Sequence, residues 1–183
     1  MEACMSDDLK FLHRAVELAL LAEQQGNLPI GALITLDGEV IAEAGNAMLT
    51  PHYHPGRHAE TEALQRVAIA LWPRSRDMTC YTTLEPCMMC MGTLLLHGVG
   101  RIVFGAQDSA GGAGKALACL PPYYAEGKGV PQWHGPLLPE ICDDLFKRAL
   151  LRFDPRGCFS RNDATPAHGA SFFKPAGAAG DYR

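Results

Sequence analysis

Apolar positions recur along this chain at two spacings, and these spacings predict a succession of helices and strands. After Ser6, a plausible helix cap, apolar residues return every three or four positions, so we expect a first helix over residues 6–25 that ends at Gly26. Residues 31–36 form a mostly apolar run that is typical of a buried strand. The Asp37-Gly38 pair that follows predicts a two-residue hairpin turn.

The remaining elements continue this alternation. We expect, in chain order, the second hairpin strand over residues 39–44, a helix from His58 that stops before Pro73, a strand over 78–83, a helix over 87–96, a strand over 101–104, a fifth strand near 136–138 and a last helix over 141–153. Strands that alternate with helices predict an α/β protein. The predicted fold is a three-layer α/β/α sandwich around a mixed five-stranded sheet.

Composition limits the number of domains and the location of the chain. With 183 residues, 48% hydrophobic and 20% charged, the chain fits one ordinary globular domain. We assign that domain to residues 1–154 and interpret residues 155–183, rich in Gly, Ala and Pro, as a C-terminal tail. No apolar stretch is long enough for a membrane span, and residues 1–10 lack the apolar core of a secretory signal. Seven cysteines without a disulfide-like spacing favour a reducing, cytoplasmic location.

Two short motifs carry the candidate chemistry, His58-x-Glu60 and Cys87-x-x-Cys90. The two cysteines lie on one face at the start of a predicted helix, where the helix dipole favours thiolates. Together with His58 they form three nitrogen and sulfur ligands, which suits tetrahedral Zn²⁺ with a fourth position open to water. Zinc lowers the pKa of such a water to about 7, and a nearby carboxylate must then transfer its proton. Glu60 is the candidate for that transfer, and spacing leaves Glu62 open as an alternative.

The two motifs resemble the H-x-E and P-C-x-x-C signature of the cytidine-deaminase-like superfamily. The similarity extends to the Pro-Ile-Gly-Ala segment at 29–32, to Tyr-Thr-Thr-Leu-Glu-Pro-Cys at 81–87 and to Gly-Arg-Ile-Val-Phe-Gly-Ala at 100–106. These segments are most similar to bacterial tRNA adenosine deaminases and related nucleobase deaminases. The resemblance covers residues 9–153.

This resemblance implies a cytidine-deaminase-like fold, a homodimer and a zinc-dependent hydrolase that releases ammonia from an amino-substituted ring. It implies the following roles by position: zinc binding by His58, Cys87 and Cys90, proton transfer by Glu60, substrate orientation by Asn46, and stabilisation of developing negative charge by backbone groups near Leu84 and Glu85. The substrate would be a nucleobase, a nucleoside or a similar heterocycle.

The metal site has alternative interpretations. A structural zinc site would need a fourth protein ligand, for which Cys80, His52, His54 and His97 are available. A redox Cys-x-x-Cys pair is a second alternative. A non-catalytic zinc-binding module is a third, and the intact Glu60 counts against it, because such a module is expected to have lost its proton-transfer residue.

Residues around the motifs also have two interpretations each. The Glu85 carboxylate is expected to bind backbone N–H groups that fix the metal loop, as an alternative to a catalytic role. Asp108 either contacts the substrate or only forms a turn. Tyr123, Tyr124 and Trp133 are either packing residues or a lid over a flat ring.

The sequence contains arguments for two kinds of substrate. The segment 104–108 and the glycines at 111–114 favour an adenosine in a tRNA loop. The net charge of −4 counts against nucleic acid, as does the segment 54–57, His-Pro-Gly-Arg, where tRNA deaminases usually have Asp-Pro-Thr-Ala. A basic cluster exists on and just after the last predicted helix, at Lys147, Arg148, Arg152 and Arg156, but such a run more often forms a solvated face. We therefore favour a small-molecule substrate, with tRNA as the alternative.

Overall fold

The protein alternates helices and strands, as its sequence pattern predicts. The computed structural model describes residues 2–153, and the predicted tail at 155–183 lies outside these described residues. The helices are α1 (Glu2–Gln24), α2 (Ala59–Gln65), η1 (Ile69–Asp77), α3 (Met88–His97), η2 (Gly114–Cys119), η3 (Tyr123–Gly129) and α4 (Pro139–Phe153). The strands are β1 (Gly31–Leu36), β2 (Glu39–Gly45), β3 (Thr79–Leu84), β4 (Arg101–Ala106) and β5 (Gln132–His134). None of the helices between residues 2 and 153 has the length and apolarity needed to cross a membrane.

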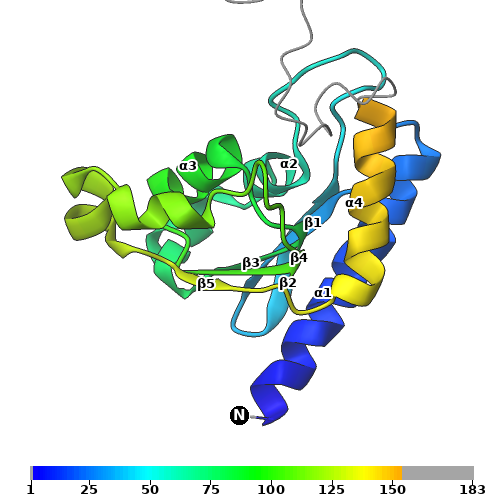
Figure 1. Cartoon of the computed structure of the whole chain (residues 1–183). Helices are drawn as coiled ribbons and strands as arrows, with labels where there is room; N and C mark the ends of the chain where they lie inside the picture. The colour runs from blue at the N-terminus through cyan, green and yellow to red at the C-terminus, as the bar shows by residue number, and fades with distance from the viewer. Residues whose placement is uncertain (1, 154–183) are drawn as a thin grey trace, which may run out of the picture.

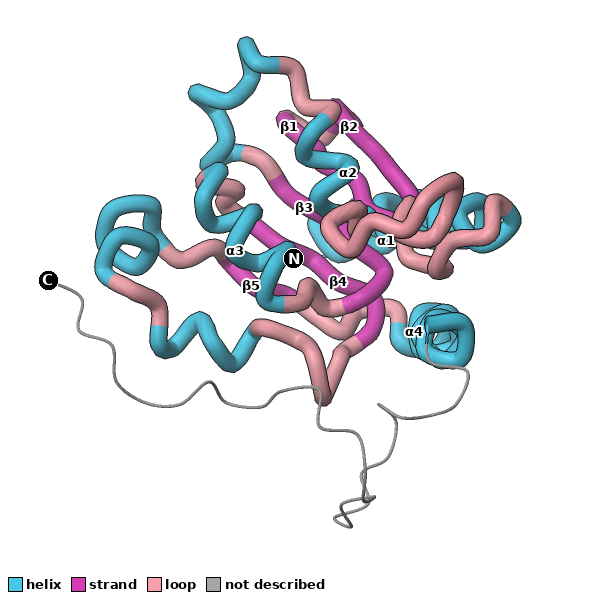
Figure 2. Tube along the Cα trace, turned by 90° about the horizontal axis from the view of Figure 1, so that it is seen from above, coloured by secondary structure: helices cyan, strands magenta, loops and turns pink. Residues whose placement is uncertain are grey.

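One mixed sheet forms the middle layer, in the order β2-β1-β3-β4-β5 (Figure 2). Strand β1 runs antiparallel to β2 and to β3, whereas β3, β4 and β5 are parallel to one another. Helices α2 and α3 cover one face of the sheet, and α1 and α4 cover the other (Figure 1). The predicted three-layer α/β/α sandwich with a mixed five-stranded sheet is therefore confirmed.

Neighbouring residues of each central strand belong to two different cores. Side chains alternate across a strand, so Ala32 and Ile34 of β1 pack with α2 and α3, whereas Leu33 between them packs with α1 and α4. Cys80 and Tyr81 of β3 divide between the same two cores. A strand buried on both faces cannot alternate between apolar and polar residues, which explains the nearly continuous apolar run of β1.

The hairpin between β1 and β2 is confirmed at the predicted dipeptide. Asp37 and Gly38 both have positive φ angles, 54° and 79°, which is the conformation of a type I′ turn. The predicted end of the first helix is also confirmed. Gly26 has a φ of 89°, and the N–H of Asn27 binds the carbonyl of Ala22, which closes α1 as in a Schellman motif.

The predicted fifth strand near 136–138 is wrong, because the fifth strand is β5 at Gln132–His134. Trp133 in β5 packs against Phe104 of β4, with ring centroids 5.9 Å apart. Gly135 then turns the chain with a φ of 156°, and Pro136 has no N–H to donate to a ladder.

Two predicted helix boundaries are also wrong. The first helix begins at Glu2 and not at Ser6, because the residues before Ser6 contain no helix breaker. The helix predicted from His58 to Pro73 ends at Gln65, since Ala68 adopts an extended conformation with φ −62° and ψ 136°. The chain then continues as the separate 3₁₀ helix η1.

A buried ion pair connects α1 to the sheet. Arg101 of β4 donates two hydrogen bonds to the carboxylate of Asp8, of 2.7 and 2.6 Å, and the Tyr81 hydroxyl donates a third of 2.8 Å. Burial alone would raise the pKa of Asp8, but the hydrogen bonds from Arg101 and Tyr81 outweigh it and lower that pKa below its ordinary value of 3.8.

Replacing Asp8 by Ala is expected to lower the free energy of unfolding at pH 7 by about 3–5 kcal/mol, because it removes the largely buried carboxylate that accepts two hydrogen bonds from Arg101 and one from Tyr81. The pKa of Asp8 is lower in the folded than in the unfolded chain, so the stabilisation is present above pH 3.8 and is lost as the pH falls through the folded value. Urea unfolding at pH 7 and at pH 3 should show the difference between the two proteins shrinking with acid. Asp7→Ala, at the exposed neighbouring position, is the control, and an equal loss in both variants would contradict this prediction.

Candidate metal centre

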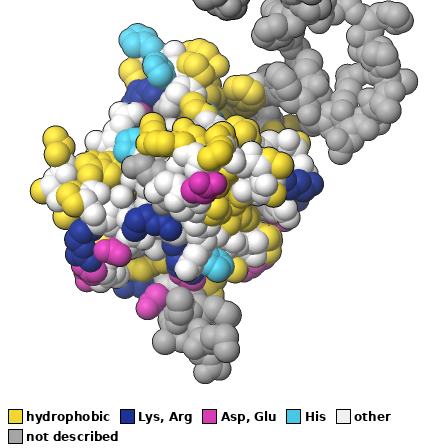
Figure 3. Space-filling model, turned by 90° about the vertical axis from the view of Figure 1, so that its left-hand side faces the viewer, with side chains coloured by type: hydrophobic (Ala, Val, Ile, Leu, Met, Phe, Trp, Pro, Cys, Tyr) yellow, Lys and Arg dark blue, Asp and Glu magenta, His cyan; other side chains and the backbone are white. Residues whose placement is uncertain are grey.

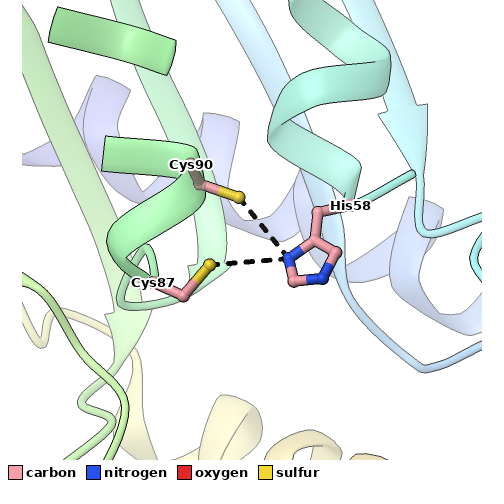
Figure 4. Close-up of side chains that lie close together, drawn as sticks. All are labelled: His58, Cys87 and Cys90. Atoms are coloured by element: carbon pink, nitrogen blue, oxygen red, sulfur yellow. Dashed lines mark hydrogen bonds between the residues drawn. The ribbon is translucent and has the colours of Figure 1, made fainter. Parts of the chain in front are cut away.

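Three side chains from two helix ends converge on one point between α2 and α3. The Nδ1 atom of His58 lies 3.7 Å from the Sγ atom of Cys87 and 3.5 Å from the Sγ atom of Cys90 (Figure 4). In a tetrahedral zinc site with bonds of about 2.1 Å to nitrogen and 2.3 Å to sulfur, such atoms lie about 3.6 Å apart. The spacing and the chemistry of these donors therefore fit Zn²⁺.

The local backbone explains why these side chains are free to meet. His58 is the residue that precedes α2, and Cys87 is the residue that precedes α3. Both have extended backbones, with φ and ψ of −73° and 157° for His58 and −71° and 173° for Cys87, and neither caps its helix with its side chain. Cys90 follows in the first turn of α3, where free N–H groups favour a thiolate.

The two thiols differ in acidity when no metal is bound. The hydrogen bond from Cys90 lowers the pKa of Cys87 to about 4 against the opposing effect of burial, and His58 lowers it further. Donation of that same hydrogen bond, together with burial, raises the pKa of Cys90. The hydrogen bond to Cys87 also raises the pKa of His58. The pKa values of the two thiols are thus shifted in opposite directions, and because zinc binds cysteine as the thiolate, binding must release the proton that Cys90 retains.

Glu60 is the carboxylate beside these ligands. Its side chain is buried, its Oε2 atom accepts a hydrogen bond of 3.4 Å from Cys90, and its Oε1 atom accepts one of 3.1 Å from the hydroxyl of Thr82. Burial raises the pKa of Glu60. A buried carboxylate with a raised pKa is suited to accept a proton and pass it on.

Glu62, the alternative to Glu60, is bound elsewhere. Arg57 donates two hydrogen bonds to its carboxylate, of 3.0 and 3.1 Å, and this hydrogen bonding lowers the pKa of Glu62. The pKa values of the two carboxylates of α2 are thus shifted in opposite directions, and it is the carboxylate of Glu60 that binds a metal-ligand candidate, Cys90. This arrangement favours Glu60 for proton transfer.

Asn46 follows the last residue of β2 and carries a free hydrogen-bond donor. Its backbone N–H binds the carbonyl of Ile30, and its Oδ1 atom accepts the N–H of Met48 at 3.1 Å. Its Nδ2 atom is buried and has no partner among the described residues. A buried donor without a partner costs free energy, so the site favours a ligand that presents an acceptor there.

Glu85 and Asp108 both hold the loop after β4. The Glu85 carboxylate accepts the N–H groups of Asp108 and Gly114 at 3.2 and 3.1 Å, so it binds backbone groups as expected, although they belong to this loop. Asp108 in turn accepts the N–H groups of residues 110 and 111, which is the turn-forming interpretation. A Cβ atom on Gly112 would lie 2.3 Å from a Glu85 oxygen, and Gly112 pairs with the Cys87 backbone. The loop is therefore packed directly against a metal-ligand candidate.

Other candidates are not brought to the metal centre. Among the described residues, the cluster suited to a metal contains only His58, Cys87 and Cys90, without the possible fourth ligands Cys80, His52, His54 and His97. Tyr124 and Trp133 pack against Met91 and Leu95 of α3. This contact favours a packing role for these aromatic residues and not a role as a lid. Leu84 ends β3 and pairs with Ala106 of β4. Sequence reasoning missed Thr82, whose only signal was that strand alternation puts it on the same face as Cys80.

Comparisons with known proteins agree with this geometry. The sequence model of a protein family, the cytidine and deoxycytidylate deaminase zinc-binding region, matches residues 5–106. A tRNA-specific adenosine deaminase of Bacillus subtilis is 39% identical over 118 residues, which are 63% of this chain and 72% of that protein. A cytosine deaminase of Candida albicans is 35% identical over 61% of this chain and 74% of that protein.

A solved structure is similar over nearly its whole length. It comes from a study of A-to-I editing by tRNA:A34 deaminases at the wobble position of transfer RNA. It superposes with a TM-score of 0.64 and 29% sequence identity, over 75% of this chain and 99% of that chain. The fold, the ligand cluster and the sequence similarity are therefore all consistent with a zinc-binding deaminase domain.

Proposed function

The chain belongs to the cytidine and deoxycytidylate deaminase family, whose members are zinc-dependent hydrolytic enzymes, and we propose that it deaminates an adenosine within tRNA. The observation that carries this proposal is the similarity to tRNA-specific adenosine deaminases, at 39% identity for the Bacillus subtilis protein and 37% for one from Buchnera aphidicola. The net charge of −4 and the segment 54–57 favour a small molecule. The named relatives favour tRNA instead.

The side chains of the site suggest how the reaction would proceed. When bound by His58, Cys87 and Cys90, zinc supplies a water of lowered pKa as a nucleophile at neutral pH. Glu60 would take one proton from the attacking water and pass it to the ring nitrogen, and would then take the second proton, from the hydroxyl group now on the ring carbon, and pass it to the leaving amine. A C–O bond forms, the C–N bond breaks, and ammonia leaves. The free Nδ2 donor of Asn46 would hold an acceptor of the ring.

A free base or nucleoside is the second candidate, and the basic residues of α4 favour it. Arg148 binds the carboxylate of Glu23 at 2.9 and 3.0 Å, and Arg152 binds the carbonyl oxygens of Glu23 and Asn27 at 3.1 and 2.6 Å. These two arginines close the C-terminal end of α1, so they are occupied within the chain. Arg156 lies outside the described residues. The Candida albicans cytosine deaminase also supports this candidate.

Ammonia release from the zinc-loaded protein distinguishes the two substrates. We expect turnover with a tRNA anticodon stem-loop that contains adenosine, and none with the same stem-loop carrying guanosine at that position. Adenosine, adenine, cytosine and guanine should be poor substrates. Turnover of one free base or nucleoside, without turnover of the stem-loop, would reject the tRNA proposal and establish the second candidate.

We also propose a homodimer formed through the outer side of α3 and the neighbouring η1. This side exposes large apolar residues, namely Ile69, Met88, Met89 and Leu96. Figure 3 shows apolar side chains gathered on the side of the molecule where α3 lies in Figure 1. Light scattering should give about twice the chain mass of 19.8 kDa, and Leu96→Glu should reduce it. A mass of one chain at every concentration would contradict the proposal.

A further inference from the structure

We propose that Arg57 is a positioning residue, whose contact with Glu62 holds His58 and Asn46 in register with each other. The inference rests on the proposed deaminase site, because it concerns the metal ligand and the substrate donor of that site. Arg57 directly precedes His58, and its side chain binds the Glu62 carboxylate at 3.0 Å, closer than Arg66, which lies 4.0 Å from the same carboxylate.

The guanidinium group of Arg57 forms a two-point contact. Its Nε atom lies 3.0 Å from Oε1 of Glu62, and its Nη2 atom lies 3.1 Å from Oε2. The Glu62 side chain is only 10% exposed, so this contact is partly shielded from water. A planar arginine fork on a carboxylate fixes orientation as well as distance. Glu62 lies in the rigid helix α2, and the fork therefore attaches residue 57 to that helix.

The backbone around Arg57 is bound on two sides. Its carbonyl oxygen accepts the N–H of Ala47 at 3.0 Å, and Ala47 directly follows Asn46. On the other side, the Thr61 hydroxyl binds the carbonyl oxygens of Gly56 at 2.7 Å and of His58 at 2.8 Å. The peptide at residues 56–58 is thus held between α2 and the segment that carries Asn46.

This arrangement has two consequences for the site. A metal-binding histidine depends on the groups that orient it, and the loss of such a group typically changes metal affinity or activity about 10–100-fold. The His58 side chain forms no capping hydrogen bond at the start of α2. Its orientation therefore depends more on the contacts that fix the neighbouring backbone, such as the Arg57 fork and the Thr61 hydrogen bonds. Glu62 lies one helical turn after His58. Its carboxylate is bound by the arginine fork, which keeps it on Arg57 and away from the metal ligands.

The rate of zinc release tests this inference without any substrate. The full-length, zinc-loaded protein is mixed with an excess of a chromogenic chelator, at a temperature where circular dichroism shows every variant folded. Arg57→Met removes the fork but keeps a long apolar side chain, and the double variant R57E/E62R restores an ion pair with exchanged charges. Arg74→Met is the matched control, because Arg74 makes a similar fork on Asp37, of 2.7 and 2.8 Å, in the hairpin turn.

We expect Arg57→Met to release zinc about 10–100-fold faster than the unchanged protein, with a matching fall in kcat/KM on the substrate identified above. Arg74→Met should release zinc at the unchanged rate, and R57E/E62R should recover most of the loss. Equal release rates for Arg57→Met and Arg74→Met would overturn the inference. A folded R57E/E62R protein as fast as Arg57→Met would also overturn it. Failure of the tRNA proposal would leave the zinc-release result intact, so the two failures are distinguishable.

Discussion

Glu60→Gln is expected to reduce turnover by about 10²–10⁴-fold while the protein still binds one zinc ion per chain. The amide keeps the shape of the side chain and still presents an oxygen to the hydroxyl of Thr82, which lies 3.1 Å from Oε1 in the unchanged protein. It cannot take a proton, however, so the transfer between water, ring nitrogen and leaving amine is lost. Single-turnover ammonia release and metal analysis of the same preparation measure both properties.

The matched variant is Glu62→Gln, which alters the other buried carboxylate of α2. Because the Glu62 carboxylate is bound to Arg57, its loss should act only through positioning, by no more than about 100-fold. Full turnover in Glu60→Gln with an inactive Glu62→Gln would assign proton transfer to Glu62 and refute the role given to Glu60.

Removal of one thiolate ligand should abolish both metal binding and turnover. Cys90→Ala leaves His58 and Cys87 as the only members of the cluster, and two ligands hold zinc far more weakly than three. A chelator should have the same effect on the unchanged protein, and added Zn²⁺ should restore turnover. Zinc content by mass spectrometry and ammonia release are the measurements.

Cys119→Ala is the control for this loss, because Cys119 is an exposed thiol outside the cluster. It should retain both zinc and activity. The circular dichroism spectrum of the chelated protein should stay unchanged, since the two main cores are apolar and contain none of the three ligand candidates His58, Cys87 and Cys90. Chelation that unfolds the chain while Cys90→Ala still turns over would support a structural zinc site instead.

Local sequence was sufficient wherever one or two residues determine the backbone. The turn at Asp37-Gly38 and the helix end at Gly26 both require positive φ angles, which these residue types adopt readily. Strand β5 has no such signal. It is defined by the contact of Trp133 with Phe104, residues that are far apart in sequence, and a three-residue strand is too short to show a period.

In the candidate site, too, some residues could be predicted from local sequence and others depend on contacts between distant segments. The spacing of Cys87 and Cys90 and the placement of His58 identified the ligand cluster, because both motifs begin helices whose first turns face each other. Which of the two carboxylates lies beside the ligands was not predictable from spacing. That depends on Arg57, which binds Glu62, and on Thr82, which binds Glu60 from a different element.

The closure of α1 by arginines of α4 has a consequence for synthesis of the chain. Glu23 and Arg148 are 125 residues apart, and a ribosome adding about 5–20 residues per second needs about 6–25 s to cover that distance. During this time α1 has emerged without the helix that shares its core and binds its last carbonyl oxygens. The nascent α1 can already pack on β1, β2 and β3, but the part of this core that α4 supplies is completed only near the end of translation.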